Sequence, residues 1–169
     1  LRTRRQRQMC IRDSSYPRSV LIAGGSGGLG AAIASELAAR GDVLTLVARN
    51  ADRLGAVPVA AKRLALDLRD PRNAHVAVDA AVDHGGGLDV VVNAVGVVAF
   101  GNVVDLSLDT MEELFLTNTF VPVALAKAAL THLRPGGVIV NISGVIAEQN
   151  LPGMACLLYT SPSPRDKTV

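Results

Sequence analysis

The chain has 169 residues, of which 49% are hydrophobic and 3% aromatic, and its formal net charge is +2. This length predicts one domain with enough apolar residues to bury a core. The scarcity of aromatic side chains argues against a surface that stacks nucleic-acid bases, and no apolar run is long enough to predict a membrane-spanning segment.

The two ends of the chain differ in composition from the rest. Residues 1–14 carry five arginines and one of the two cysteines, and residues 156–169 contain a Ser/Pro run and the other cysteine. The ends can be encoded in part by complementary nucleotide strings, and both resemble translated transposon-type sequencing adapters of the kind found in metagenomic reads. We therefore expect both ends to be adapter-derived, with 1–14 disordered, around a native segment at 15–155. The alternative is a basic arm that binds nucleic acid and a Pro-rich tail.

Without the two ends, the formal net charge changes from positive to negative. Residues 1–14 carry +4 and residues 156–169 carry +1, which leaves −3 for residues 15–155. A mildly acidic segment gives no reason to expect nucleic-acid or membrane partners. No cysteine remains for a disulfide or metal site, and the histidines lack the spacing of metal ligands. We therefore expect a cytoplasmic protein without a metal.

Apolar strand-like runs alternate with helix-like patterns along the native segment. Strands are predicted at 19–23, 42–48, 62–67, 88–94 and 138–143, with helices from 28 to a cap at 41, at 71–84 and at 109–133. Leu29, Ile33 and Leu37 fall on one face of the first helix, and Asp109 with Glu112 forms a capping-box pattern for the last. This alternation predicts an α/β fold with a doubly wound parallel sheet in the order 3-2-1-4-5, ending after the fifth strand.

The glycine-rich stretch after the first strand reads AGGSGGLG. It fits two spacings, Gly25-x-Gly27-x-x-Gly30 and Gly24-x-x-x-Gly28-x-Gly30. Both need glycine because some turn positions have positive φ, and because a side chain would keep a pyrophosphate from the helix N-terminus. The stretch therefore predicts a dinucleotide-binding loop.

The second predicted strand ends in Val47-Ala48-Arg49-Asn50. Folds that bind NAD usually place an acidic residue here, to hold the ribose hydroxyls. Arg49 instead suits a 2′-phosphate, so the sequence favours NADP over NAD. The alternative is a solvated charge at the end of a strand.

Asn118 is unusual in the middle of a helix, since asparagine competes with the helical backbone. Pro122 follows four residues later and has no N–H to donate to the Asn118 carbonyl. This pair predicts a kinked helix whose carbonyl could hold an ordered water. The alternative is a kink with a solvated asparagine.

Together these motifs resemble the short-chain dehydrogenase/reductase family over about 19–155. The family pattern TGxxxGxG reads AGGSGGLG here, with Ala23 in the threonine position, and NNAG reads NAVG, so that Asn93 and Gly96 match. Asn118 and the run IVNIS fall at the expected spacing. The resemblance implies a Rossmann-type fold and a nicotinamide cofactor, for which Arg49 favours NADP over NAD.

The resemblance also implies roles for particular residues. Asn118 would belong to the catalytic proton relay through a water, and Ser143 would be the catalytic serine, although Gly144 follows where relatives have a second serine. The residues implied in cofactor binding are Gly24, Ser26, Gly28, Leu29, Gly30, Arg49, Asp67, Leu68, Asn93, Ala94 and Gly96.

The family's Tyr-x-x-x-Lys would place tyrosine at Leu157 and lysine at Ser161. Tyr159 is no substitute, because Ser163 and not lysine follows it at the required spacing. The resemblance implies an oxidoreductase that moves hydride between nicotinamide and a carbonyl or alcohol carbon, and an intact protein that is a homo-oligomer. We expect the chain as written to be inactive. The alternative function is a non-catalytic NADP sensor on the same fold.

Overall fold

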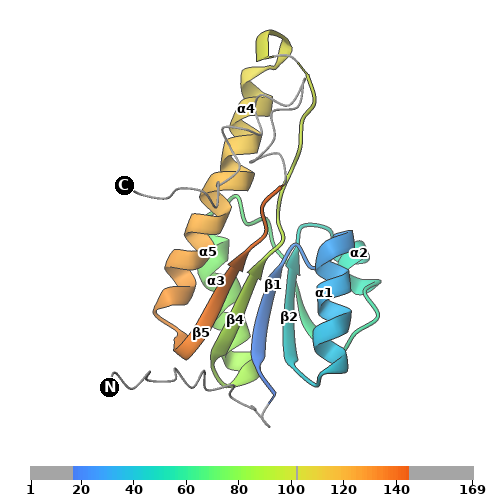
Figure 1. Ribbon diagram of the computed structural model, residues 1–169, viewed down its shortest axis with the longest axis vertical. Coiled ribbons are helices and arrows are strands. Elements are labelled where there is room, and N and C mark those ends of the chain that lie inside the picture. The colour runs from blue at the N-terminus through green and yellow to red at the C-terminus, as the bar shows by residue number, and fades with distance from the viewer. Residues whose placement is uncertain (1–16, 102, 145–169) are drawn as a thin grey trace, which may run out of the picture.

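The computed structural model describes residues 17–101 and 103–144, which form a parallel sheet with helices on both faces (Figure 1). The sheet order is β3-β2-β1-β4-β5, so the predicted Rossmann-type topology is confirmed. The predicted adapter-derived ends lie outside the described residues. The elements are β1 Ser19–Ala23, α1 Gly28–Ala39, β2 Val43–Ala48, α2 Ala51–Gly55, β3 Ala61–Ala65, α3 Arg72–Gly85, β4 Leu88–Asn93, the short η1 Val103–Asp105, α4 Leu108–Phe115, η2 Leu116–Phe120, α5 Val121–Leu130 and β5 Leu133–Asn141.

The strand β1 lies at the centre of the sheet, and every residue in it is buried. It pairs in parallel with β2 on one side and β4 on the other, in a register that sets Ala23 beside Val47 and Asn93. A strand covered on both faces needs a continuous apolar run, which explains why Val20–Ala23 shows no polar alternation. This pairing brings the carboxyl ends of three strands to one edge.

Two apolar layers cover the sheet. On one face, α3 and α5 pack over residues such as Leu21 and Val91; on the other, α1 and α2 pack over residues such as Ile22 and Leu46. Figure 1 shows α1 beside β1 and β2, while α5 lies along the opposite side of the sheet. This helical covering on both faces is what a parallel sheet requires.

The first helix packs through its smallest residues. Gly30 and Ala34 are its buried positions, whereas Leu29 is 55% exposed. The predicted apolar face is therefore wrong at Leu29, because the helix approaches the sheet closely enough that only small side chains fit beneath it. The predicted end is confirmed, since Gly41 follows the helix with φ +83°, the left-handed conformation that suits glycine there.

The long helix begins earlier than predicted. Ser107 caps α4 by accepting a hydrogen bond from the Thr110 amide at 3.1 Å, so the capping box at Asp109 is wrong. A serine hydroxyl at the N-cap satisfies an amide that Asp109, already inside the first turn, cannot reach. The helix ends at Leu130, three residues before its predicted end, because β5 begins at Leu133.

A wider, π-helical turn connects the two halves of this helix. It covers Leu116–Phe120, just before Pro122 near the start of α5. Proline cannot donate the usual helical hydrogen bond, and π turns of this kind are frequent at functional sites. The structure has a π turn where the sequence predicts a kink, and the water on the Asn118 carbonyl stays a prediction.

The continuous helical stretch Leu108–Leu130 is 23 residues long and by length and composition alone could cross a membrane. From the apolar runs of the sequence, we expected no segment of this kind. Its inward side, including Leu114, Val121 and Leu125, is buried within the fold. A core helix passes the same test of length and composition, so the stretch is weak support for a membrane span.

The edge strand β5 starts at Leu133, five residues before the predicted 138, and ends at Asn141, two before 143. Its early part contains Pro135-Gly136-Gly137, and its register with β4 shifts between Leu88 and Val90. The glycines and proline suppress the apolar signal there, which is why the sequence pattern missed the strand's first residues. The other predicted strands differ from the observed ones by at most two residues at either end.

Candidate cofactor site

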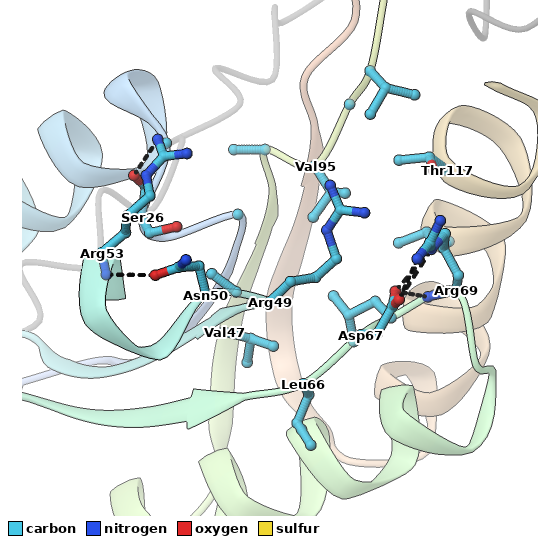
Figure 2. A pocket seen from close by; sticks show the side chains of 18 residues that line it. Ser26, Val47, Arg49, Asn50, Arg53, Leu66, Asp67, Arg69, Val95 and Thr117 are labelled. Carbon is cyan, nitrogen blue, oxygen red and sulfur yellow. Dashed lines mark hydrogen bonds and ion pairs between the residues drawn. The ribbon is translucent and has the colours of Figure 1, made fainter. Parts of the chain in front are cut away.

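A pocket of about 260 Å³ opens at the carboxyl ends of β1, β2 and β4 (Figure 2). This is the edge where open α/β sheets bind their ligands. The pocket contains seven of the predicted cofactor residues, namely Gly24, Ser26, Arg49, Asp67, Leu68, Ala94 and Gly96. Gly28, Leu29, Gly30 and Asn93 are not among its lining residues, and neither are the predicted catalytic residues Asn118 and Ser143.

The glycine loop is held too tightly for side chains at two positions. Gly24 has φ +80°, and a Cβ there would lie 2.5 Å from the Ala94 carbonyl oxygen. A Cβ on Gly30 would lie 2.2 Å from the Gly24 carbonyl oxygen. The loop and the first turn of α1 therefore pack backbone against backbone, and only glycine permits this.

Gly28 differs from the two packed glycines, because a Cβ built there meets nothing within 4 Å. It begins α1, whose N-cap Gly27 offers no side-chain acceptor and whose first turn contains no acidic residue. A helix N-terminus with this composition carries a partial positive charge and leaves its amide groups available to an anion. Packing therefore does not demand glycine at position 28, whereas a phosphate bound at this helix N-terminus, as the sequence predicts, would favour a residue without a side chain.

Two arginines and an asparagine follow β2 at the pocket. Arg49 extends across the pocket in Figure 2, and its side chain is 54% exposed. Asn50 caps α2 by accepting the Arg53 amide at 2.8 Å. The Arg53 guanidinium lies against the Ser26 carbonyl at 3.4 Å. The short helix α2 therefore adds a second cation, Arg53, which the sequence analysis did not single out.

Asp67 and Arg69 form the opposite wall. The Arg69 guanidinium donates to both carboxylate oxygens of Asp67, with the shortest contact at 2.6 Å, and the Arg69 amide donates to Asp67 Oδ1 at 3.0 Å. These hydrogen bonds hold the pKa of Asp67 below its usual value; burial opposes them, and the charge of Arg49 adds to them. Asp67 thus stays ionised, and its carboxylate is already paired with Arg69. This partner, two residues along the chain, was not predicted from the sequence.

The floor of the pocket comes from the end of β4. Asn93 is buried, its side chain accepts the Val95 amide at 3.3 Å, and its carbonyl accepts the Ile142 amide at 3.0 Å. The Ala94 amide donates to the Ala23 carbonyl at 2.9 Å. Asn93 therefore shapes the loop beneath the pocket and does not line it.

Asn118 anchors the connection that leaves β4. Its side-chain oxygen accepts the Val97 amide, and its side-chain nitrogen donates to the Val97 carbonyl, both at 2.9 Å. The side chain thus satisfies both backbone groups of one residue in a segment without regular structure. This clamp, which joins η2 to the 94–101 segment, gives Asn118 a positioning role that the sequence could not reveal.

Thr117 brings an unsatisfied hydroxyl to the same pocket. The residue is 4% exposed, and its Oγ1 has no hydrogen-bond partner among the described residues. It lines the pocket from η2 and lies opposite Arg49 and Asn50 in Figure 2. A buried hydroxyl without a partner costs free energy, so a ligand atom in the pocket that bonds to it would recover that cost.

The predicted catalytic end is only partly described. Ser143 is exposed and lies just beyond β5, at the same sheet edge as the pocket. The positions expected for the family's tyrosine and lysine lie outside the described residues. They are Leu157 and Ser161, and Tyr159 lies between them.

Comparison with known proteins places the chain in a family. The family model described as short chain dehydrogenase matches residues 18–161. The elsinochrome reductase 1 of Elsinoe fawcettii is 34% identical, over 76% of this chain and 51% of its own. A hydroxynaphthalene reductase of Aspergillus fumigatus is 32% identical, over 80% of this chain and 52% of its own.

Solved structures agree with these relatives. A short-chain dehydrogenase/reductase from Serratia marcescens superimposes with a TM-score of 0.80 at 30% identity, covering 85% of this chain and 62% of that one. A short chain dehydrogenase from Burkholderia cenocepacia, solved in complex with NADP, has a TM-score of 0.80 at 32% identity with the same coverages. The chain spans about half the length of the curated relatives it matches. With its sheet order and glycine loop, the chain belongs to the short-chain dehydrogenase/reductase family.

Proposed function

We propose that the protein is an NADP-dependent oxidoreductase that transfers hydride between nicotinamide and a carbonyl or alcohol carbon of a small molecule. The observation that carries the NADP preference is Arg49, which extends into the pocket directly after β2. Asn50 follows it, so no carboxylate stands at the two positions where an NAD-binding fold holds the ribose diol. A guanidinium in that place suits a phosphate on the same ribose.

The residues present fit such a cofactor. Gly24 and Gly30 bring the loop backbone close beneath the pocket, and the N-terminus of α1 at Gly28 faces open space. Arg53 adds a second positive charge beside Arg49, and Thr117 offers a buried hydroxyl without a partner. A structurally similar dehydrogenase from Burkholderia cenocepacia is known in complex with NADP, which supports the same cofactor here.

The cofactor supplies the hydride chemistry when it is bound. This chain's own part is to hold the pyrophosphate at the α1 N-terminus, to pair Arg49 with the 2′-phosphate, and to fix the 94–101 segment through Asn118. Ser143, at the same edge, would orient the substrate oxygen. The general acid implied by the family resemblance falls at Leu157, so we expect the chain to bind nucleotide without turnover. NADPH-dependent reduction of any ketone by the 169-residue chain would contradict this expectation.

The test of the cofactor preference is the substitution Arg49→Gln. Removing a charge-assisted hydrogen bond to a phosphate costs about 1.5–3 kcal/mol, so the Kd for NADP⁺ should rise by roughly 10- to 100-fold while that for NAD⁺ changes little. Arg40→Gln is the matched control, because Arg40 is paired with Glu36 at the far end of α1. Equal losses for NADP⁺ and NAD⁺ in the Arg49 variant would refute the preference.

A further inference from the structure

Glu113 on α4 is an acidic side chain that approaches two of the pocket's arginines. Its Oε1 lies 3.9 Å from Arg49 Nη1 and 3.5 Å from Arg69 Nη1. Glu113 is 45% exposed, so it stands at the rim and is not one of the residues lining the pocket. It connects the β2 side of the pocket to the helix on the opposite side.

The two arginines are held very differently. Arg69 is fixed by the hydrogen bonds to both carboxylate oxygens of Asp67. Among the described residues, Arg49 makes one ion pair, the long 3.9 Å contact with Glu113, and it acts on Asp67 through its charge without a hydrogen bond. A contact of that length between exposed groups is weak and leaves the guanidinium free to change partner. Arg49 is therefore a cation whose present partner can be displaced.

We propose that Glu113 is a specificity-determining residue that competes with a 2′-phosphate for Arg49. In this way it limits how much more tightly the pocket binds a nucleotide with a 2′-phosphate than one without it. The proposal rests on the proposed function, because it assumes that Arg49 meets the 2′-phosphate. When a phosphate pairs with Arg49, the Glu113 carboxylate loses that partner and then faces a second anion nearby. Nucleotides without the 2′-phosphate encounter neither effect.

The charges around the pocket set the size of the effect. The pocket is lined by three arginines, Arg49, Arg53 and Arg69, and by the carboxylate of Asp67, which Arg69 already neutralises. Glu113 adds a second carboxylate at the rim, 3.9 Å from Arg49 and 3.5 Å from Arg69. Neutralising Glu113 removes the repulsion between one charge and a phosphate dianion several ångströms away in a solvated site. We expect about fivefold tighter binding of a 2′-phosphorylated ligand, and a smaller gain at high salt, because salt screens exposed charges.

The experiment compares Glu113→Gln with Glu112→Gln in the full 169-residue chain. Glu112 is exposed and next in sequence, so its substitution changes the net charge equally without touching Arg49. The probes are adenosine 2′,5′-bisphosphate and adenosine 5′-monophosphate, which differ only in the 2′-phosphate. Isothermal titration calorimetry gives both dissociation constants, and circular dichroism confirms that the variants are folded.

The expected result is that E113Q tightens the bisphosphate about fivefold, while the monophosphate in E113Q and both ligands in E112Q change by less than about twofold. The role of Glu113 would be overturned if E113Q tightened the binding of both ligands equally, or if E112Q tightened the binding of the bisphosphate as much as E113Q does. The proposed function is judged separately, by the wild-type ratio of the two constants. A ratio near one refutes NADP preference, whereas a high ratio that E113Q leaves unchanged refutes only the competition by Glu113.

Discussion

Alanine substitutions at Gly30 and Gly28 separate packing from ligand binding within one loop. A Cβ on Gly30 would lie 2.2 Å from the Gly24 carbonyl oxygen and 2.9 Å from its carbon. Both contacts are with backbone atoms, so no side-chain rotation relieves them and the loop must move. Overpacking of this kind costs about 1–3 kcal/mol, and a backbone clash belongs at the upper end.

The same substitution at Gly28 meets nothing within 4 Å. Gly28 has no left-handed φ, and replacing glycine by alanine at such a position stabilises a protein by about 0.4–1 kcal/mol, so Gly28→Ala should leave stability unchanged or raise it. Its methyl group would nevertheless occupy the space in front of the α1 N-terminus. We expect NADP⁺ binding to weaken about tenfold or more, the size of one lost charge-assisted hydrogen bond.

The assay is thermal unfolding of both variants followed by titration with NADP⁺. Gly30→Ala should lower the Tm by roughly 6–12 °C, which corresponds to about 3 kcal/mol in a chain of this size, and should also lose binding. Gly28→Ala should keep its Tm and lose binding alone. Wild-type affinity in the Gly28 variant would refute the phosphate site, and a wild-type Tm in the Gly30 variant would refute the packing argument.

Three further predictions concern the clamp, the orphaned hydroxyl and acid stability. Thr117→Val should weaken NADP⁺ binding without lowering the Tm, since the hydroxyl has no partner among the described residues; unchanged affinity would show that the ligand does not use it. Asn118→Ala should speed hydrogen exchange at the Val97 amide, whereas Asn118→Asp keeps the acceptor and the protection; equal exchange in both would contradict the clamp. Burial raises the pKa of Asp42, but the hydrogen bonds from Arg18 and the charges of Arg18 and Arg40 together lower it by more, so this carboxylate stabilises the fold when ionised. The difference in unfolding free energy between wild type and Asp42→Asn should therefore be largest near neutral pH and shrink below about pH 4, and denaturant titrations that find it independent of pH would contradict this.

The sheet order could be predicted because its signals are local. Each buried strand is a short apolar run, and its alternation with helices predicts a parallel sheet with right-handed crossovers. The order 3-2-1-4-5 follows from the glycine loop after the first strand, which is typical of the nucleotide-binding arrangement. The boundaries failed where local signals compete. Ser107 and Asp109 are both acceptable N-caps, and only the backbone geometry shows that Ser107 accepts the Thr110 amide. At β5, Pro135 and its following glycines hide a strand that pairing with β4 creates.

Site residues could be predicted from the sequence where their place directly after a strand restricts which residue type can serve there. A strand that leads into a phosphate-binding loop is followed by glycines, which predicts the roles of Gly24 and Gly30. The residue after the second strand meets the adenosine ribose, which predicts the role of Arg49. Contacts between distant segments could not be predicted in this way. Asn118 reaches Val97 across 21 positions. Glu113 on α4 lies near Arg49, which follows β2, although the two residues are far apart in the sequence. Neither pairing leaves a pattern in the local sequence.

A crystal structure of the chain with bound NADP⁺ would locate both phosphate groups of the cofactor. We expect the pyrophosphate at the N-terminus of α1, beside Gly28, and the 2′-phosphate on Arg49, with the Arg49 to Glu113 contact broken. An adenosine moiety bound outside the pocket, or a 2′-phosphate facing away from Arg49, would contradict this expectation.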